Sequence, residues 1–318
     1  MKKTNRSFKT LTAILSVVCI LSSILLLSSC KKNKEATDMI FNLNSEGTEY
    51  AIAGYKGEEK EITIPGEYKG LPVTSVAEKA FFGNTILESV VLPNSITDIY
   101  TSAFEGCTAL KSIDLPGTLN SIGYRCFQDC SSLTELAIPE GITKLPQTFV
   151  DGCSALETIE LPATLNLISY ENFFGCDSLK SIKVATGNKI YHSNGNCVIH
   201  TADKILVAGT ANSVIPADGS VTSIGNFAFF NRQSLKSIMI PSTIQKIGNH
   251  AFTGCNSLDK IYYQGTASDW NGVTNSASAI QHAPYATLYF YSETKPTEEG
   301  NFWHYTSGNS ISTWESDK

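Results

Sequence analysis

The chain has 318 residues, of which 42% are hydrophobic and 17% are charged, and its formal net charge is −6. This composition is ordinary for a globular protein and excludes disorder along the whole chain. Without residues 1–30 the chain keeps 20 basic and 30 acidic residues, and a body this acidic argues against nucleic acid or anionic lipid as a partner.

Residues 1–29 have the layout of an export signal. Four basic residues precede an apolar run, which closes in Leu27-Ser28-Ser29-Cys30. This ending resembles the lipobox of bacterial lipoproteins, which implies cleavage before Cys30 and acyl chains on that cysteine. An uncleaved membrane helix is the alternative interpretation, because about 17–19 apolar residues nearly span a bilayer. Both interpretations predict an exported domain that is tethered to a membrane.

Residues 30–38 are predicted to be the lipidated cysteine and a polar linker. Behind them, residues 39–60 alternate around Asn44-Ser45-Glu46-Gly47, a turn composition that predicts a β-hairpin. Because an exposed end of a repeat stack needs a covering element, we expect this hairpin to be the N-terminal cap.

One pattern repeats across residues 61–270, and between Leu87 and Leu179 its interval is a constant 23 residues. The clearest columns are Leu87, Leu110, Leu133, Leu156 and Leu179; Pro93, Pro116, Pro139 and Pro162; and Cys107, Cys130, Cys153 and Cys176. A fixed period in this range predicts a solenoid. Within one copy, Ile113 and Leu115 alternate as in a strand that Pro116 ends, and a shorter return segment follows. One copy buries too little to fold alone, so neighbours must stack.

The copies LKSIDLPGTLNSIGYRCFQDCSS (110–132) and LKSIMIPSTIQKIGNHAFTGCNS (235–257) resemble the BspA-like leucine-rich repeats of bacterial surface proteins. The resemblance implies a leucine-rich-repeat solenoid, α/β or mainly β, with about 23 residues per coil. It also implies an adhesin-like surface lipoprotein that binds a protein or cell-surface ligand, such as a host matrix protein. The alternative is a structural or envelope scaffold without a host ligand.

The period breaks once, between residues 185 and 219, where Leu179 and Leu235 are separated by more than two repeats. Two strands are expected there, at 197–200 and 204–208. An elongated coil with a hairpin is one interpretation, and a binding loop is the other, because long insertions in rigid scaffolds often carry function.

Residues 271–318 are predicted to be a C-terminal cap and tail. Aromatic residues cluster between Phe302 and Trp314. They either cover the last coil or form a ligand site.

Five of the nine cysteines share one column, so stacking points their side chains the same way; they are Cys107, Cys130, Cys153, Cys176 and Cys255. We therefore predict buried free thiols rather than disulfides. No Cys or His pair has the spacing of a zinc site, and motifs of hydrolases or nucleotide-binding enzymes are missing. We accordingly expect no catalytic, metal or cofactor-binding residues, and no cofactor.

The residues on either side of the central strand position are predicted to point outward as a continuous strip, the candidate ligand face. Its members are Ser112, Asp114, Glu135, Thr158, Glu160, Lys183, Met239 and Tyr262. The strip is acidic in its middle and gains apolar bulk at its C-terminal end. Either these residues only solubilise the sheet, or the strip binds a basic or amphipathic protein segment.

Overall fold

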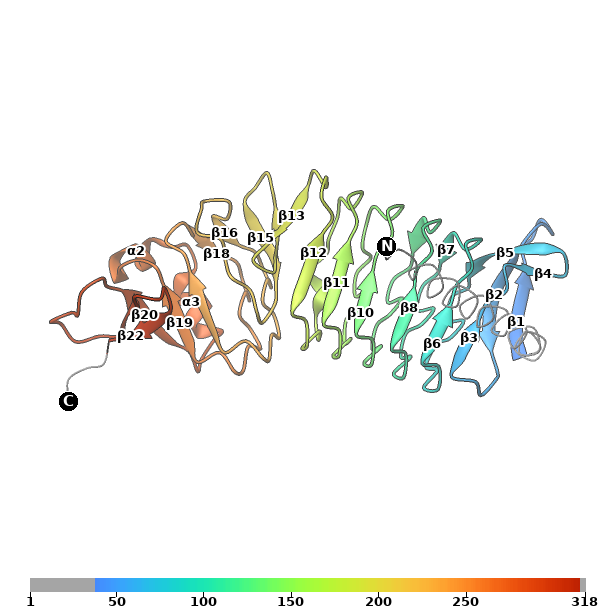
Figure 1. The fold of residues 1–318 in the computed structure, drawn as a ribbon, viewed down its shortest axis with the longest axis horizontal. Helices are drawn as coiled ribbons and strands as arrows, with labels where there is room; N and C mark the ends of the chain where they lie inside the picture. The colour runs from blue at the N-terminus through green and yellow to red at the C-terminus, as the bar shows by residue number, and fades with distance from the viewer. Residues whose placement is uncertain (1–37, 315–318) are drawn as a thin grey trace, which may run out of the picture.

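Every regular coil opens with a short strand in which one apolar side chain lies between two more exposed ones. In β8 (Ser112–Asp114) and β10 (Glu135–Ala137), the central Ile113 and Leu136 are buried and their neighbours are exposed. This is the alternation of a strand with one face on the core. The structure is a computed structural model that describes residues 38–314, and its strands stack into an elongated body (Figure 1). The predicted signal and Cys30 lie outside the described residues.

The opening strands run in parallel along one side of the body, and their outward surface is called the strand face below. Before the insert they are β3 (Glu61–Thr63), β6 (Ser89–Val91), β8, β10, β11 (Thr158–Leu161) and β12 (Ser181–Val184). After it they are β17 (Ser237–Ile240), β19 (Lys260–Tyr263) and β20 (Thr287–Tyr291). Equivalent residues pair directly, for example Ile159 with Ile182. Positions 23 residues apart in the sequence are therefore neighbours in space.

A second side of the body is formed by shorter strands later in each coil. These are β5 (Leu71–Val76), with β4 (Glu67–Tyr68) beside it, then β7 (Asp98–Ile99), β9 (Ser121–Ile122), β15 (Ile205–Gly209), β16 (Ser223–Ile224) and β18 (Lys246–Ile247). A single bridge between Lys144 and Leu167 continues this ladder before the insert. The return segment that we expected after each proline is therefore mostly a two-residue strand.

The third side of each coil is a turn that carries two interior columns. The phenylalanine column, each member at most 2% exposed, consists of Phe104, Phe127, Phe173, Phe229 and Phe252. In the cysteine column, the thiols donate to carbonyl oxygens of the preceding coil at 3.0–3.2 Å; its members are Cys107, Cys130, Cys153, Cys176 and Cys255. All seven cysteines of the described residues are buried and free, which confirms the prediction of free thiols.

The predicted N-terminal hairpin is confirmed. β1 (Met39–Leu43) pairs with β2 (Tyr50–Tyr55) in antiparallel fashion, and Asn44 closes the turn by accepting hydrogen bonds from the backbone of Thr48 and Glu49. β2 then pairs in parallel with β5 of the first coil. The hairpin thus covers the otherwise open end of the stack.

The insert has the structure of an elongated coil that contains a hairpin, which was one of its two interpretations. β13 (Tyr191–Asn194) and β14 (Cys197–His200) form a hairpin, and β14 also pairs with β15. The two predicted strands are thus present, and β13 is an additional one. β15 pairs in parallel with β16, so it supplies the second strand of a coil. The buried apolar residues fall into two clusters that meet at the insert.

The seam is defined as the junction of the turns 169–178 and 225–234. Here hydrogen bonds from side chains join the coils, in place of the regular backbone hydrogen bonds. Arg232 stands in the cysteine column and is 3% exposed. Its Nη1 donates to the carbonyl of Phe173 at 2.9 Å, and its Nε donates to that of Gly209 at 2.8 Å. Ser234 Oγ donates to the carbonyl of Asp177. Two coils that are more than fifty residues apart in sequence are joined in this way.

The parallel ladder extends beyond residue 270, where we predicted its end, because β20 pairs with β19. Two short helices, α2 (Ala267–Gly272) and α3 (Ser276–Gln281), lie on either side of Thr274, which continues the second ladder through a single parallel bridge to Lys246. Thr266 caps α2, since its side chain accepts from the amide of Asp269. β21 (Phe302–Tyr305) continues the sheet in parallel, and β22 (Ile311–Thr313) closes it in antiparallel fashion.

The protein is thus a mainly β solenoid, and the α/β alternative is set aside because helix is confined to α2, α3 and one 3-10 turn at Tyr170–Phe173 among the described residues. Within residues 38–314, no helix has the length and apolar character needed to cross a bilayer.

Candidate ligand-binding face

The middle of the strand face contains a trough of about 320 Å³. It lies across β8, β10 and β11, and its lining includes five of the predicted face residues: Ser112, Asp114, Glu135, Thr158 and Glu160. The pairing register of β10 and β11 places Glu135 opposite Thr158 and Ala137 opposite Glu160. Ser112 and Asp114 come from β8, which lies beside β10 in the stack but belongs to the preceding sheet. The trough is hollow where the small side chain of Ala137 stands in the column otherwise filled by Asp114 and Glu160. Neighbouring strands are about 4.8 Å apart, so the two carboxylates flank a gap of two strand spacings.

The charge of the trough is partly compensated from one end. Lys183, another predicted face residue, places its Nζ 2.9 Å from Oε1 of Glu160. Among the described residues, neither Asp114 nor Glu135 has an ion-pair partner within 4 Å. Negative charge is therefore concentrated at Asp114 and Glu135, where the side chains are exposed.

Two expectations about the face are wrong. The strip is not continuous, because β10, β11 and β12 belong to one sheet and β17, β19 and β20 to another, with the insert between them. Tyr262 is also not an open contact residue, since it is only 9% exposed. Its ring packs against Tyr289 and Trp303, with centroid distances of 5.4 and 5.8 Å. Met239 is half-buried.

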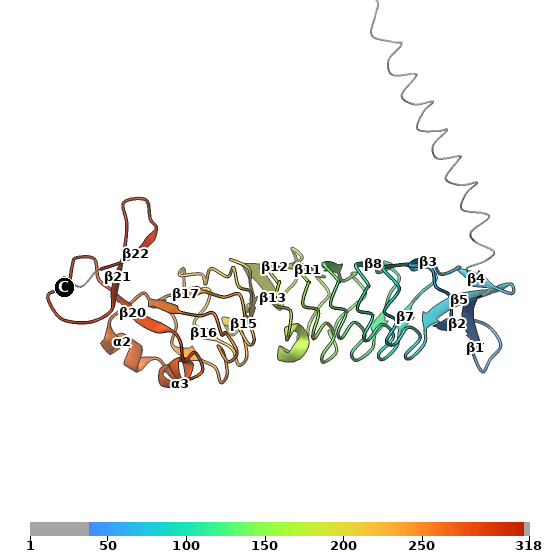
Figure 2. The ribbon, with the colours of Figure 1, turned by 90° about the horizontal axis from the view of Figure 1, so that it is seen from below.

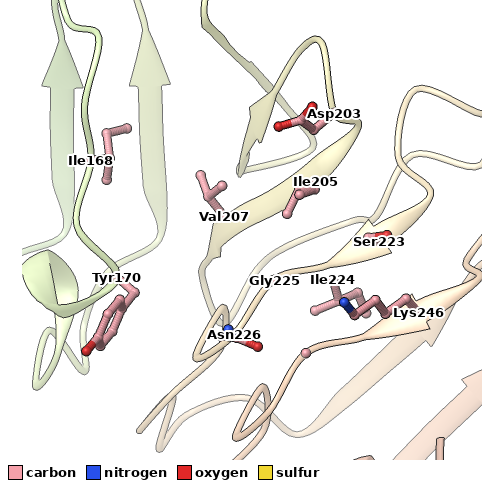
Figure 3. Close-up of a pocket in the computed structure, with 11 residues that line it drawn as sticks. Ile168, Tyr170, Asp203, Ile205, Val207, Ser223, Ile224, Gly225, Asn226 and Lys246 are labelled. Atoms are coloured by element: carbon pink, nitrogen blue, oxygen red, sulfur yellow. The ribbon is translucent and has the colours of Figure 1, made fainter. Parts of the chain in front are cut away.

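A second cavity, of about 360 Å³, opens on the other side of the body at the seam (Figure 3). Its walls come from the coil before the insert (Ile168 and Tyr170), from the insert (Asp203, Ile205 and Val207) and from the two coils after it. The floor is aliphatic, and Lys246, Asn226 and Asp203 stand around it. Sequence patterns did not indicate this cavity, because the path of the insert between β12 and β15 follows no repeat.

No three His, Cys, Asp or Glu side chains of residues 38–314 gather in a way that would hold a metal ion. The exposed carboxylates of the trough suit attraction of a cationic group.

A parallel β-solenoid with an in-register ladder, a phenylalanine column and an outward polar strip defines a leucine-rich-repeat protein. The chain belongs to the family of the BspA type leucine-rich repeat region, whose model matches residues 74–196 and 209–280 in six copies. A search of curated proteins found no match.

Solved structures share the fold. The leucine-rich repeat protein of T. pallidum (TpLRR) is 26% identical, with a TM-score of 0.50 over 70% of this chain and 89% of that one. A leucine-rich repeat protein of Eubacterium ventriosum is 17% identical, with a TM-score of 0.51 over 80% and 77% of the two chains. The pneumococcal vaccine antigen PcpA is 20% identical, with a TM-score of 0.51 over 71% and 70%. The last two likenesses concern the fold alone.

Proposed function

We propose that the protein is an exported, lipid-anchored protein of the cell surface whose strand face binds a basic or amphipathic segment of a protein partner. The observation that carries this proposal is the acidic trough, in which the side chains of Asp114, Glu135 and Glu160 surround the notch at Ala137. Membership in a surface-protein repeat family and the lipobox-like end at Cys30 support the export and the anchor.

The trough fits a cationic side chain that enters over Ala137. Carboxylates on both sides attract its charge, while the strand backbone below supplies a rigid floor. Because these groups are exposed, the attraction is screened by salt, and binding is expected to weaken as ionic strength rises. Attraction of this kind raises the association rate and discriminates against acidic partners.

The trough is tested by reversing its charge with Asp114→Lys, Glu135→Lys and Glu160→Lys in one chain. The purified domain is assayed against a panel of matrix proteins and intact cells, with folding checked by circular dichroism. A matched control carries the same change in charge away from the trough, with lysine at Glu293, Glu298 and Glu299, which are exposed.

We expect the trough variant to lose a partner that both the wild type and the control bind. Equal binding by all three proteins would show that the partner does not bind at the trough, and would leave the cavity at the insert as the candidate site. If the wild type binds no member of the panel, the scaffold interpretation is favoured.

The anchor is tested separately by metabolic labelling with a fatty acid. Wild type and Cys19→Ala should be labelled, since Cys19 lies inside the apolar run, and Cys30→Ala should not. Labelling of Cys30→Ala at the wild-type level would contradict the anchor. Protease treatment of intact cells then distinguishes a surface from a periplasmic location.

A further inference from the structure

The strand face changes its chemistry at its C-terminal end, over β17, β19, β20 and β21. In the earlier coils its outward positions are mostly small or charged. At this end they form an aromatic patch, defined by Met239, Tyr262, Tyr289, Tyr291, Trp303 and Tyr305. The register places these residues together, since Met239, Tyr262 and Tyr289 are paired in turn and Tyr291 pairs with Trp303. Residues two apart on a strand share a face, so Tyr289 and Tyr291 point the same way.

Trp303 is the fixed centre of the patch. Its side chain is fully buried, and its Nε1 donates to the carbonyl of Tyr263 at 2.8 Å. Tyr262, Tyr291 and Tyr305 surround it edge to face, with ring centroids 5.8, 5.1 and 5.0 Å away. Tyr289, Tyr291 and Tyr305 remain half-exposed. A buried aromatic centre within a rim of partly exposed tyrosines is the composition of an interface hot spot.

Covering the last coil does not explain this arrangement. The inner side of the terminal strands packs on the core through Leu288 and Phe290, and Trp270 and Ala279 close it from α2 and α3. The tyrosines lie on the opposite, outward side, where a sheet needs no apolar cover. The β21–β22 hairpin moreover projects beyond the strand face (Figure 2).

We propose that the aromatic patch docks a proline-rich segment of a protein partner in the polyproline II conformation. This inference rests on the proposed function, in which the strand face binds protein, and it names a second contact on that face. The six residues of the patch are uncharged, and Lys260 lies two residues before Tyr262 on the same side of β19, which disfavours a cationic ligand. The hydroxyls of Tyr289, Tyr291 and Tyr305 have no hydrogen-bond partner among residues 38–314, so they are free to donate.

A polyproline II segment matches these features in two ways. Its proline rings are apolar and pack against aromatic rings, and its backbone carbonyls, which make no internal hydrogen bonds, accept from tyrosine hydroxyls. The segment is already extended before it binds, so little conformational entropy is lost on docking. A cationic residue next to the prolines is not required here, because the acidic trough lies on the other side of the insert.

The test measures fluorescence anisotropy of labelled decaproline with the purified domain, and a Gly-Ser peptide of equal length serves as reference. Tyr289→Ser and Tyr291→Ser are each expected to weaken decaproline binding by about tenfold. The matched control is Tyr285→Ser, because Tyr285 is 70% exposed and lies outside the patch. Tyr289→Phe keeps the ring and removes only the hydroxyl. The emission spectrum of buried Trp303 and near-UV circular dichroism verify that each variant keeps its fold.

Decaproline binding that the two patch variants lose and Tyr285→Ser keeps would support the inference. Equal affinity for the Gly-Ser peptide, or no effect of either patch variant, would overturn it. Cellohexaose is the third probe: if it binds through Tyr289 and decaproline does not, the patch is a glycan platform and the peptide assignment is wrong. The trough variant should bind decaproline like wild type. Loss of the trough partner with no decaproline binding by any protein would leave the proposed function standing and refute only this inference.

Discussion

Replacing Arg232 with methionine should uncouple the two halves of the solenoid. Among residues 38–314, Arg232 is the only charged residue that is buried, and burial lowers the pKa of its guanidinium. The side chain, which follows the insert, donates to the carbonyl of Phe173 before the insert and to that of Gly209 at the end of β15 within it. Methionine fills a similar volume but donates no hydrogen bond. The substitution therefore removes the bridge and keeps most of the packing.

The free energy of unfolding that Arg232→Met loses is the difference between two opposing terms. Hydrogen bonds from a charged donor contribute about 1.5–3 kcal/mol each, so loss of both bridges destabilises by about 3–6 kcal/mol. The variant also avoids the desolvation penalty of a buried guanidinium, which offsets part of this loss. The carbonyls belong to the backbone and cannot be removed with their partner, so we expect a net loss of about 3 kcal/mol.

The three tryptophans provide the assay, because Trp270, Trp303 and Trp314 all follow the seam in sequence. Tryptophan fluorescence therefore reports on the C-terminal half, whereas far-UV circular dichroism reports on both. In urea, the two signals should change together for wild type and separately for Arg232→Met, since coupling in a solenoid runs through neighbouring coils. Arg232→Cys, which installs the usual residue of the column, should not restore coupling, because a thiol has one weak donor and cannot bond both carbonyls. As a control, Arg125→Met changes an exposed arginine. Coincident transitions with an unchanged midpoint in Arg232→Met would refute the bridge.

Three further predictions follow from the same structure. Phe127→Ala should lower the free energy of unfolding by about 3–5 kcal/mol, because its buried ring is stacked 5.4 Å from Phe104. Burial raises the pKa of Cys107 and Cys176 to about 12, so iodoacetamide at pH 9 should leave the seven buried thiols of the native protein unmodified. Hydrogen bonds from Lys111 and Lys60 lower the pKa of Glu88 from 4.5 to about 2. Its contribution to stability is thus complete above pH 4.5 and is lost as the pH falls toward 2. Glu88→Gln should flatten the pH dependence of the melting temperature in that window.

Each of these predictions has its own control. Tyr124→Ala, at a ring that is 55% exposed, should cost under about 1 kcal/mol, and a loss as small for Phe127→Ala would show that the register is misassigned. The thiols should all react in urea; rapid labelling of native Cys107 would contradict its burial. Glu135→Gln, without an ion pair, should leave the pH profile in the acid range close to wild type. If Glu135→Gln and Glu88→Gln changed the pH profile equally, the effect would not come from the hydrogen bonds of Glu88.

Sequence alone was enough for the regular part of the solenoid. A coil contacts mainly its neighbours, so one interval of 23 residues places Phe127 beneath Phe104 and Glu135 beside Thr158 without further information. The outward direction of Asp114 and Glu160 follows from the alternation of a strand, and the buried state of the cysteines follows from their common column. These features depend only on local periodicity.

The tertiary structure decided what lies where the period stops. Arg232 meets Phe173 across an insert that no repeat brings into register, so the path of β13, β14 and β15 selects its partner. The same holds at the C-terminal end, where β21 extends the sheet and Trp303 packs on the ring of Tyr262, on a face that we expected to be open. Contacts between equivalent positions of neighbouring repeats can be predicted from the repeat interval. Contacts between unlike segments depend on how a loop closes and which surfaces then exclude water, and those are properties of the folded molecule.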